Sequence, residues 1–577
     1  MVTQRDFAAG GTERHGHSNP WVVLAVVLAG GFMQLVDVSI VNVAIPSIQG
    51  ELHTTYAQIQ LVLVLYSLGF AGTLITSARL GDIYGRRKTF LIGVTGFTGF
   101  SVLCAAAPTA NVLVGARFAQ GVFAGLMFAQ ILSVIQVTFP PQTRGKALGA
   151  FGAVIGVATI LGPLLGGLLI KLNLFGLDWR LIFYVNVPIG VLTLFGALSQ
   201  LGESRAPNAP RLDILGAILV TAGLVMLVYG VAVGREKGWP IWVDALMAAA
   251  VPILAAFVVY EIGKTRRNDS PLVIMTLFKE RAFSIGMVLL FVFLLALPSY
   301  FFVFSLYIQI GEGFTPLAAG LAGFPFALAS GFAAARSDAV AARLGNRVLV
   351  VGCALLVAGM LLVLGTAHLV GTRPHIYSFV VPLLISGAGL GFFIAPVINI
   401  VLAGIHVEGA GSASGVLSTV QQAGAAIGIA LTGIVFFGAI GSGATNAAQG
   451  VTPRLRAALS AAGLPASAVG QSIAGFDRCF HDRATATDPT TNPASCQVAQ
   501  RNAAQGQPQL RQVVGAAFRD AALQASARNF SAAFQRTLVY LAGIFLLALL
   551  LVLALPKVDP RALPTAAVAD PGRPVRP

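Results

Sequence analysis

Two charged residues, Asp37 and Arg117, lie inside long apolar stretches of this chain of 577 residues. A carboxylate in a membrane span is energetically costly, so such a group usually faces other helices and has a function. Because desolvation favours the protonated form of an acid, we expect Asp37 to bind and release a proton. The alternative is an acid near the membrane interface that only forms a structural ion pair.

Arg117 is the second buried charge and is followed by Gln120 and Gly121 in the pattern Arg-x-x-Gln-Gly. A guanidinium inside a span needs an acid, a carbonyl group or water beside it. We therefore expect Arg117 to have such a partner inside the bundle, and Asp37 is one candidate. A side chain that extends to the helix end is the alternative, and the sequence leaves open whether the two charges are in contact.

The composition predicts that these two residues lie on membrane-spanning helices. Hydrophobic residues make up 56% of the chain and charged residues 10%, with a mean hydropathy of +0.82, whereas soluble domains carry about 25% charged residues. Stretches of about 20 apolar residues, the length that spans a bilayer, recur about fourteen times. They are 21–45, 57–77, 90–107, 112–134, 148–170, 181–200, 213–233, 243–262, 282–307, 317–334, 348–370, 377–403, 413–440 and 537–556. The expected fold is all-α and polytopic.

The basic residues follow the membrane and are not gathered in one soluble module. The net charge is +15, yet Lys and Arg concentrate in the loops on one side of the predicted spans, such as 79–88, 144–146 and 264–281. The positive-inside rule then places both termini in the cytoplasm of a multi-pass inner or plasma membrane protein. A nucleic-acid partner is not expected.

A run rich in glycine lies within the fifth apolar stretch, which has no charge between Leu148 and Ile170. It contains Gly162, Pro163, Gly166 and Gly167. Such residues would break a soluble helix but are tolerated in lipid, and small residues let another helix approach closely. We expect a bend or a sliding helix contact here, with a kink that matters only for packing as the alternative.

A charged loop joins the second and third stretches and contains Gly81, Asp82, Gly85, Arg86 and Arg87. The glycines allow a tight turn, and the acid can cap a helix or pair with an Arg of a neighbouring helix. Such a contact can lock one conformation of a moving bundle, although an ordinary basic loop is the alternative. The matching loop of the second half, 343–347, repeats a Gly and two Arg, which indicates an internal repeat.

The chain is expected to divide into five parts along its length. These are a cytoplasmic tail 1–20, a six-helix half 21–200, two linker helices with a cytoplasmic loop 201–281, a second six-helix half 282–556 and a tail 557–577. The second half includes a polar segment, 441–535, expected outside the cell.

The outer segment 441–535 is expected to end in an amphipathic helix. That helix covers 510–534 and carries Val513, Val514, Phe518, Leu523, Phe530 and Phe534 at helical spacing. Cys479 and Cys496 lie earlier in the segment, where oxidation persists, so a disulfide is expected, with two free thiols as the alternative.

These motifs together resemble one family, the fourteen-helix drug:proton antiporter branch of the major facilitator superfamily. The resemblance rests on the motifs above and on the stretches 35–46, 179–190, 306–309, 411–415 and 421–424. It implies two six-helix halves around two central helices. It also implies proton transfer at Asp37 and Arg117, a conformational latch in the loop 80–88 and an antiporter hinge at 162–167.

The expected function is export of amphipathic or cationic compounds in exchange for protons by a monomer, with no cofactor and no enzymatic activity. One alternative keeps the fold and exports a lipid or a self-made metabolite. Another is a non-transporting receptor or scaffold. The polar or aromatic residues nominated for the substrate cavity are Gln34, Asn42, Tyr66, Asn399 and Gln421.

Overall fold

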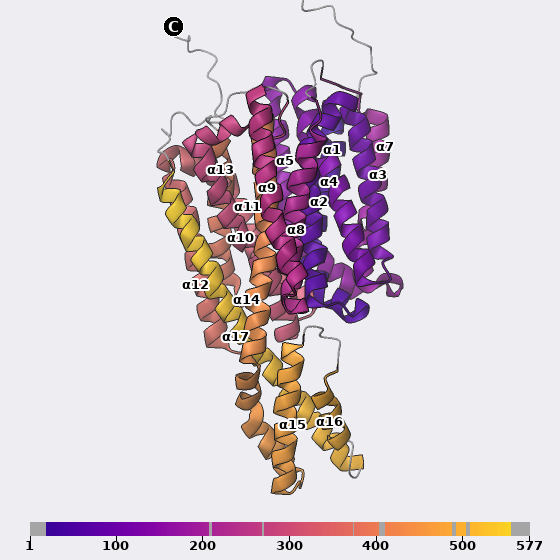
Figure 1. Ribbon diagram of the computed structural model, residues 1–577, viewed down its shortest axis with the longest axis vertical. Helices are drawn as coiled ribbons and strands as arrows, with labels where there is room; N and C mark the ends of the chain where they lie inside the picture. Colours follow the sequence, from indigo (N-terminus) through magenta and orange to yellow (C-terminus); the bar gives the residue numbers. More distant parts are fainter. Residues whose placement is uncertain are drawn as a thin grey trace, which may run out of the picture.

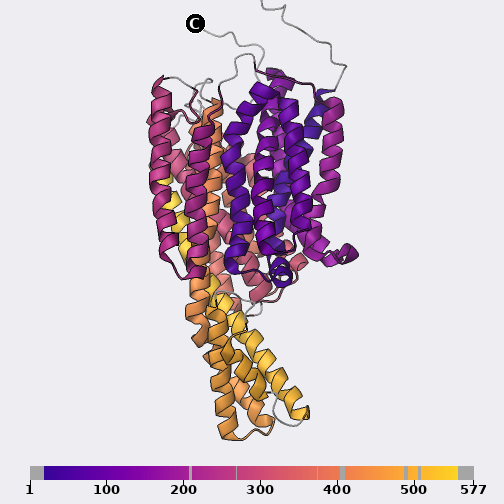
Figure 2. The ribbon, with the colours of Figure 1, turned by 45° about the vertical axis from the view of Figure 1, so that its right-hand side comes forward.

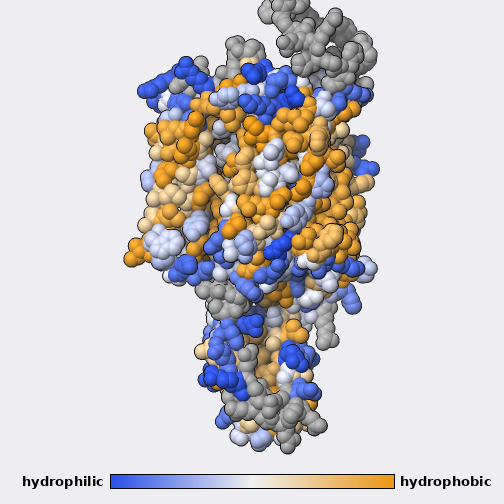
Figure 3. All heavy atoms as spheres, turned by 90° about the vertical axis from the view of Figure 1, so that its right-hand side faces the viewer, coloured by the Kyte–Doolittle hydropathy of each residue, from blue (hydrophilic) through white to orange (hydrophobic). Residues whose placement is uncertain are grey.

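The computed structural model describes residues 19–206, 211–267, 270–372, 374–402, 410–486, 492–503 and 508–555. Within these residues, fourteen helices are long and apolar enough to cross a membrane, which confirms the predicted number. On the face shown in Figure 3, apolar residues predominate across the middle of the bundle, with hydrophilic residues gathered at its two ends. The chain is therefore an all-α, multi-pass membrane protein.

The first six spans lie together on one side of the bundle (Figure 1). They are α1 (Pro20–Leu52), α2 (Tyr56–Tyr84), α3 (Arg86–Ala105), α4 (Ala110–Thr138), α5 (Pro141–Leu172) and the pair α6 (Leu181–Tyr184) and α7 (Asn186–Gln200). The last six lie on the other side. They are α10 (Arg281–Leu306) with the π-helical turn η4 (Tyr307–Gly311), α11 (Pro316–Leu344), α12 (Arg347–Val370), α13 (Val380–Leu402), α14 (Ala410–Ala461) and α17 (Pro508–Leu553). We call these groups the N-half and the C-half.

The internal repeat is visible in the turns that join the second and third helices of each half. Gly85 follows α2 with φ of +114°, and Gly345 follows α11 with φ of +56°. Each glycine N–H donates to the carbonyl four residues earlier, that of Gly81 at 2.9 Å and that of Ala341 at 2.7 Å. Because a positive φ strains residues with a Cβ, glycine is required at both turns.

Two linker helices, α8 (Ile214–Lys237) and α9 (Ile241–Arg267), are fastened to α2 at both ends. At one end the Glu236 carboxylate accepts a hydrogen bond from Ala57 N, at 3.3 Å. At the other end the Arg79 guanidinium donates to the carbonyl oxygens of Arg211 (3.0 Å), Ser270 (2.8 Å) and Pro271. The linker helices therefore lie along α2 of the N-half, next to the place where α2 packs against α14.

The segment 441–535 forms a helical protrusion beyond one face of the bundle (Figures 1 and 2). Helices α14 and α17 extend past that face and are joined there by α15 (Ala466–Thr485) and α16 (Ala494–Ala503). Apolar side chains of α14, α15 and α17 form a separate small core, which includes Val451, Leu455, Ile473, Phe476 and Val514. The bond between Cys479 and Cys496 joins α15 to α16, so the expected disulfide is present.

The amphipathic helix expected over 510–534 is present as the first part of α17, but the prediction of which residues form its buried face was partly wrong. Val514, Phe530 and Phe534 are buried, whereas Val513 is 52% exposed and Leu523 is 72% exposed. In a continuous helix of 3.6 residues per turn, neighbours such as Val513 and Val514 point about 100° apart, so both cannot face one small core.

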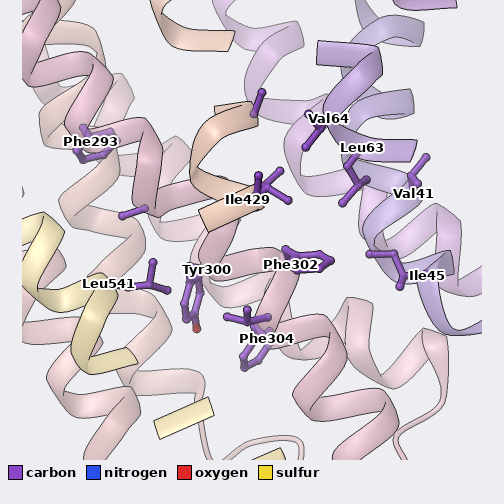
Figure 4. Packing of buried hydrophobic residues seen from close by; sticks show 14 of the residues in the cluster. Val41, Ile45, Leu63, Val64, Phe293, Tyr300, Phe302, Phe304, Ile429 and Leu541 are labelled. Carbon is purple, nitrogen blue, oxygen red and sulfur yellow. The ribbon is translucent and has the colours of Figure 1, made fainter. Parts of the chain in front are cut away.

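The two halves meet near the face that carries the protrusion, which we call the protrusion face. Ser305 of α10 donates to the carbonyl oxygen of Asn42 in α1, at 2.6 Å. The rings of Tyr56 at the start of α2 and Phe437 of α14 have centroids 4.0 Å apart. Behind these contacts, one apolar cluster contains residues of both halves, including Ile45 of α1 and Phe302 of α10 (Figure 4).

Candidate functional site

The two charges predicted to act together form a buried ion pair. Arg117 Nη1 lies 2.5 Å from Asp37 Oδ2, and the side chains are 1% and 0% exposed. The contact joins α4 to α1 in the interior of the N-half. Arg117 therefore does not extend to a helix end, so that alternative is wrong. Asp37 is out of contact with water, and its role in proton binding stays a prediction.

Amide side chains complete the shell around the Asp37 carboxylate. Its Oδ1 accepts hydrogen bonds from Asn186 Nδ2, at 2.9 Å, and from Gln120 Nε2, at 3.1 Å. Both amides also donate to Ser101 Oγ, at 3.2 and 2.7 Å respectively. Four helices, α1, α3, α4 and α7, thus contribute to one buried polar network, whose members hold the carboxylate as an acceptor only.

Arg117 has further, uncharged partners besides the carboxylate. Its Nε donates to the carbonyl oxygen of Val62 at 3.3 Å, and its Nη1 donates to Gln120 Oε1 at 2.7 Å. The guanidinium carbon lies 4.0 Å from the centroid of the Tyr66 ring, a cation–π distance. Two polar atoms close to this network, the Tyr66 hydroxyl and Gln34 Oε1, are buried without a hydrogen-bond partner.

The glycines of α5 bring three helices into close contact. A Cβ on Gly166 would lie 2.8 Å from Ile40 Cγ1 of α1, and one on Gly162 would overlap Ser39 Oγ. A Cβ on Gly167 would lie 2.5 Å from Leu317 Cα of α11, across the boundary between the halves. The helix runs unbroken through Pro163, so a tight helix contact is what the structure contains at this motif.

The opposite partner of this contact is also a glycine. A Cβ on Gly320 of α11 would lie 2.5 Å from the carbonyl oxygen of Pro163. Helices α5 and α11 therefore approach each other through backbone atoms, which only small residues permit. Sequence reasoning identified the α5 side of this contact and not the α11 side, because Gly320 is one of three glycines spread along an otherwise ordinary apolar stretch.

The loop after α2 is held within the N-half. Asp82 Oδ1 lies 2.8 Å from Arg86 Nη2, so the acid pairs with the first residue of the next helix. Arg87 Nη2 donates to the carbonyl oxygen of Leu198 at 2.7 Å. A Cβ on Gly81 would overlap the side chain of Gln130 on α4. The latch residues thus join α2, α3, α4 and the end of α7.

Glu203 is a member of this loop site that sequence reasoning missed. Its two carboxylate oxygens accept hydrogen bonds from the backbone N–H groups of Arg87, at 3.1 Å, and Lys88, at 3.2 Å. These groups belong to the first turn of α3, where a negative charge is favourable. The only signal in the sequence was an isolated acid just after the sixth span, which is common in polar loops.

The remaining nominated residues are not brought together. The Asn42 side chain donates to the Val38 carbonyl oxygen of the same helix, at 3.5 Å. The backbone carbonyl of Asn42 accepts the hydrogen bond from Ser305 of α10. Asn399 of α13 is exposed and Gln421 of α14 is partly buried. The side chains of Gly411, Ser412 and Ser414 lie outside the described residues. In the part of the chain that the structure covers, no group of three or more His, Cys, Asp or Glu could hold a metal ion.

Twelve spans in two halves joined by two linker helices, with a buried ion pair in one half and glycine contacts between the halves, define a helical membrane transporter. The chain belongs to the Major Facilitator Superfamily, whose family model matches residues 27–429. It is therefore a transporter and not an enzyme.

Curated relatives align with most of the chain. The probable actinorhodin transporter of Streptomyces coelicolor is 35% identical over 94% of this chain and 92% of its own length. The puromycin resistance protein pur8 of Streptomyces alboniger is 34% identical over 76% of this chain and 87% of its own. The tetracenomycin C resistance and export protein of Streptomyces glaucescens is 32% identical over 73% and 77%.

Solved structures share the fold at low sequence identity. A bacterial homolog of the human lysosomal transporter Spinster, in an inward-facing and unoccupied conformation, superposes with a TM-score of 0.52 and 16% identity, covering 93% of this chain and 99% of that one. A POT family transporter in complex with a thioalcohol-conjugated peptide gives a TM-score of 0.56 and 13% identity, over 72% and 90%.

Proposed function

We propose that this protein exports antibiotic-like small molecules from the cell in exchange for protons, with Asp37 as the proton-binding group. The observation that carries the proposal is the position on α1 of Asp37, which is buried in its pair with Arg117 of α4. Ser39 and Ile40, which meet the glycines of α5, follow Asp37 within three residues. Asn42, whose carbonyl contacts α10, follows within five. A change at Asp37 is therefore adjacent to contacts that a transport cycle must rearrange.

The chemistry of the pair explains how a proton could drive that rearrangement. When Asp37 is ionised, its charge is compensated by Arg117, and three donors hold it. Protonation of Asp37 leaves Arg117 as an uncompensated buried charge, which is strongly unfavourable. Movement of α1 relative to α4, which admits water or an electron-rich group of the cargo, relieves this cost. One proton crossing a potential of about 150 mV supplies about 3.5 kcal/mol for the cycle.

The orientation in the membrane follows from charge. The Arg and Lys residues of the loop after α2 and of the segment after α9 lie at the end of the bundle away from the protrusion. By the positive-inside rule, we place that end and both chain termini in the cytoplasm and the protrusion face outside. A disulfide in the protrusion fits an extracytoplasmic location. The protein is expected to act as a monomer.

The export of one self-made metabolite is a second candidate for the cargo. The match to the probable actinorhodin transporter extends over 541 residues, whereas the match to the multidrug resistance protein Stp of Mycobacterium tuberculosis covers 409 residues, or 70% of this chain. The similarity to the probable actinorhodin transporter therefore includes parts of the chain that the multidrug exporter does not match. This favours one dedicated cargo for this protein.

The test is exchange of protons for cargo by purified protein in proteoliposomes. An imposed proton gradient should drive uptake of actinorhodin or puromycin into vesicles, with matching proton movement reported by an entrapped pH dye. Asp37→Asn should abolish both signals. Its amide oxygen can still accept from Arg117, so the variant should fold and insert, although the lost counter-charge should lower its thermal unfolding temperature. Asp244→Asn, an exposed acid of α9, is the matched control and should behave as the wild type. Normal coupled transport by Asp37→Asn would refute the proposal.

A further inference from the structure

Another acid with a buried carboxylate, Glu312, lies at the protrusion-face end of the first helix of the C-half. It directly follows the π-helical turn η4, which continues α10. Both carboxylate oxygens are buried without a hydrogen-bond partner. Among the ion pairs formed by the described residues, none includes Glu312. A π-helical turn is rare and is often found at functional sites, so this carboxyl group deserves a functional explanation.

The surroundings of Glu312 disfavour a negative charge. The group stands at the C-terminal end of a helix, where the backbone carbonyls already present negative potential. Its neighbours on η4 and α17 are aromatic: the Tyr307 and Phe534 rings are stacked, with centroids 4.3 Å apart, and Gly311 contacts Phe530. The polar neighbours of this group are uncharged, namely the Tyr307 hydroxyl and, beyond it, Ser531.

The charged groups of the elements packed around this site are directed elsewhere. On α17, Arg528 lies against Gly450 of α14, and Arg536 donates to Ser442 Oγ of α14. The first turn of α11, which follows Glu312 in the chain, contains no ionisable residue. The exposed His368 of α12 contacts Gln535 of α17, which in turn donates to Ser531. This line of polar groups leads from the Glu312 site to the protein surface.

The same turn takes part in the contact between the halves. Gln309, in the middle of η4, donates to Ser305 Oγ at 2.8 Å, and Ser305 Oγ donates to the Asn42 carbonyl oxygen of α1 at 2.6 Å. The turn η4 therefore connects the Glu312 site to the contact between the halves. If the halves separate at this face, η4 loses its partner on α1 and water can reach the carboxyl group.

We propose that Glu312 is a second proton-binding group, and that its protonation closes the protrusion face. A neutral carboxyl group is accommodated in the dry, aromatic site of the closed form, whereas an ionised one requires the hydrated, open form. Protons on that side of the membrane then favour the return of the empty transporter, which is the direction that proton-for-drug exchange requires. The proposal extends the function proposed above but assigns its own role to a different residue.

The expected size of the effect follows from the affinity of this group for protons. Burial raises the pKa of Glu312 to about 7 in the closed form, from an ordinary value of 4.5. Between these two values the closed form binds more protons than an open, hydrated form, so closure is favoured as the pH falls. By linkage, the ratio of closed to open molecules should rise about tenfold between pH 8 and pH 6.

The test measures the distance across the protrusion face in full-length protein reconstituted in nanodiscs. Spin labels are placed at Phe175→Cys in the N-half and Tyr377→Cys in the C-half, which are 94% and 79% exposed. The free thiols, Cys104 and Cys353, are buried and are replaced by Ala in every sample. In the parent protein, the short-distance population should grow about tenfold relative to the long one from pH 8 to pH 6.

Glu312→Gln should show the short-distance population at both pH values, because the amide stays neutral. Asp244→Asn, an exposed acid elsewhere in the chain, should keep the parent's response to pH. As a second measurement, the infrared difference spectrum between pH 6 and pH 8 should contain a protonated-carboxyl band that Glu312→Gln lacks. An unchanged pH response in Glu312→Gln, or no pH response in the parent, would overturn the proposal.

The two proposals fail separately. If Asp37→Asn retains coupled transport, the function assigned to Asp37 is wrong, whereas the distance measurement on Glu312 is unaffected. If Asp37→Asn loses coupling but Glu312→Gln shows the parent's pH response, only the role of Glu312 is wrong.

Discussion

A single methyl group added at Gly167 should shift the protein away from the closed conformation described above. The Cβ of Gly167→Ala would lie 2.5 Å from Leu317 Cα and 2.7 Å from the carbonyl oxygen of Pro316. These are backbone atoms of α11, so they cannot rotate away as a side chain could. Because the clash exists only while α5 and α11 touch across the halves, the substitution penalises the closed form selectively.

The magnitude follows from the cost of overpacking. Extra methyl groups in well-packed interiors typically cost about 1–3 kcal/mol, which corresponds to a change of about 5- to 150-fold in an equilibrium constant. The ratio of closed to open molecules should fall by a factor in this range. Since an alanine also stabilises a helix relative to glycine by about 1 kcal/mol, the comparison needs a control on the same helix.

A matched variant provides that control. Gly152→Ala, also in α5, has open space at its Cβ, and should gain the helix preference without the clash. The assay is the spin-label distance across the protrusion face, together with transport in proteoliposomes. If Gly167→Ala and Gly152→Ala give the same distance distribution, the close contact between the halves does not control the cycle.

Three further predictions concern other parts of the site. Arg117→Lys removes the planar guanidinium that donates both to Asp37 and to the Val62 carbonyl oxygen. Coupled transport, measured as cargo uptake under a pH gradient, should therefore fall about tenfold or more. An unchanged rate would contradict the role of the pair. Glu203→Gln should lower the free energy of unfolding by no more than about 1 kcal/mol, because the lost interaction is a single exposed charge at a helix N-terminus. A large fall in the unfolding temperature would contradict this prediction. Reducing the bond between Cys479 and Cys496 should remove about 3 kcal/mol of local stabilisation. The protrusion should then be proteolysed faster, while transport is unchanged. Equal proteolysis before and after reduction would show that the small core stabilises the protrusion without the disulfide.

The spans could be predicted from sequence because the bilayer imposes their length and polarity. A stretch of about 20 apolar residues has no other favourable location, and all fourteen predicted stretches correspond to spanning helices. The turn glycines at 85 and 345 could also be predicted, since a tight turn between two long helices requires a residue without a Cβ. The helical extension of α14 into the protrusion was not foreseen, because polar sequence outside the membrane carries no comparable constraint.

The sequence by itself determined the class of the protein and identified Asp37 and Arg117 as unusual, because a charge in an apolar stretch is conspicuous without any coordinates. Only the tertiary structure decided that they touch each other, that Asn186 and Ser101 complete their shell, and that Gly167 meets α11 and not α1. These relations depend on how helices far apart in the chain are rotated against one another. Glu312 shows the same limit: in the sequence it is an acid in a short polar turn, and only the packing of η4 against α17 removes it from water.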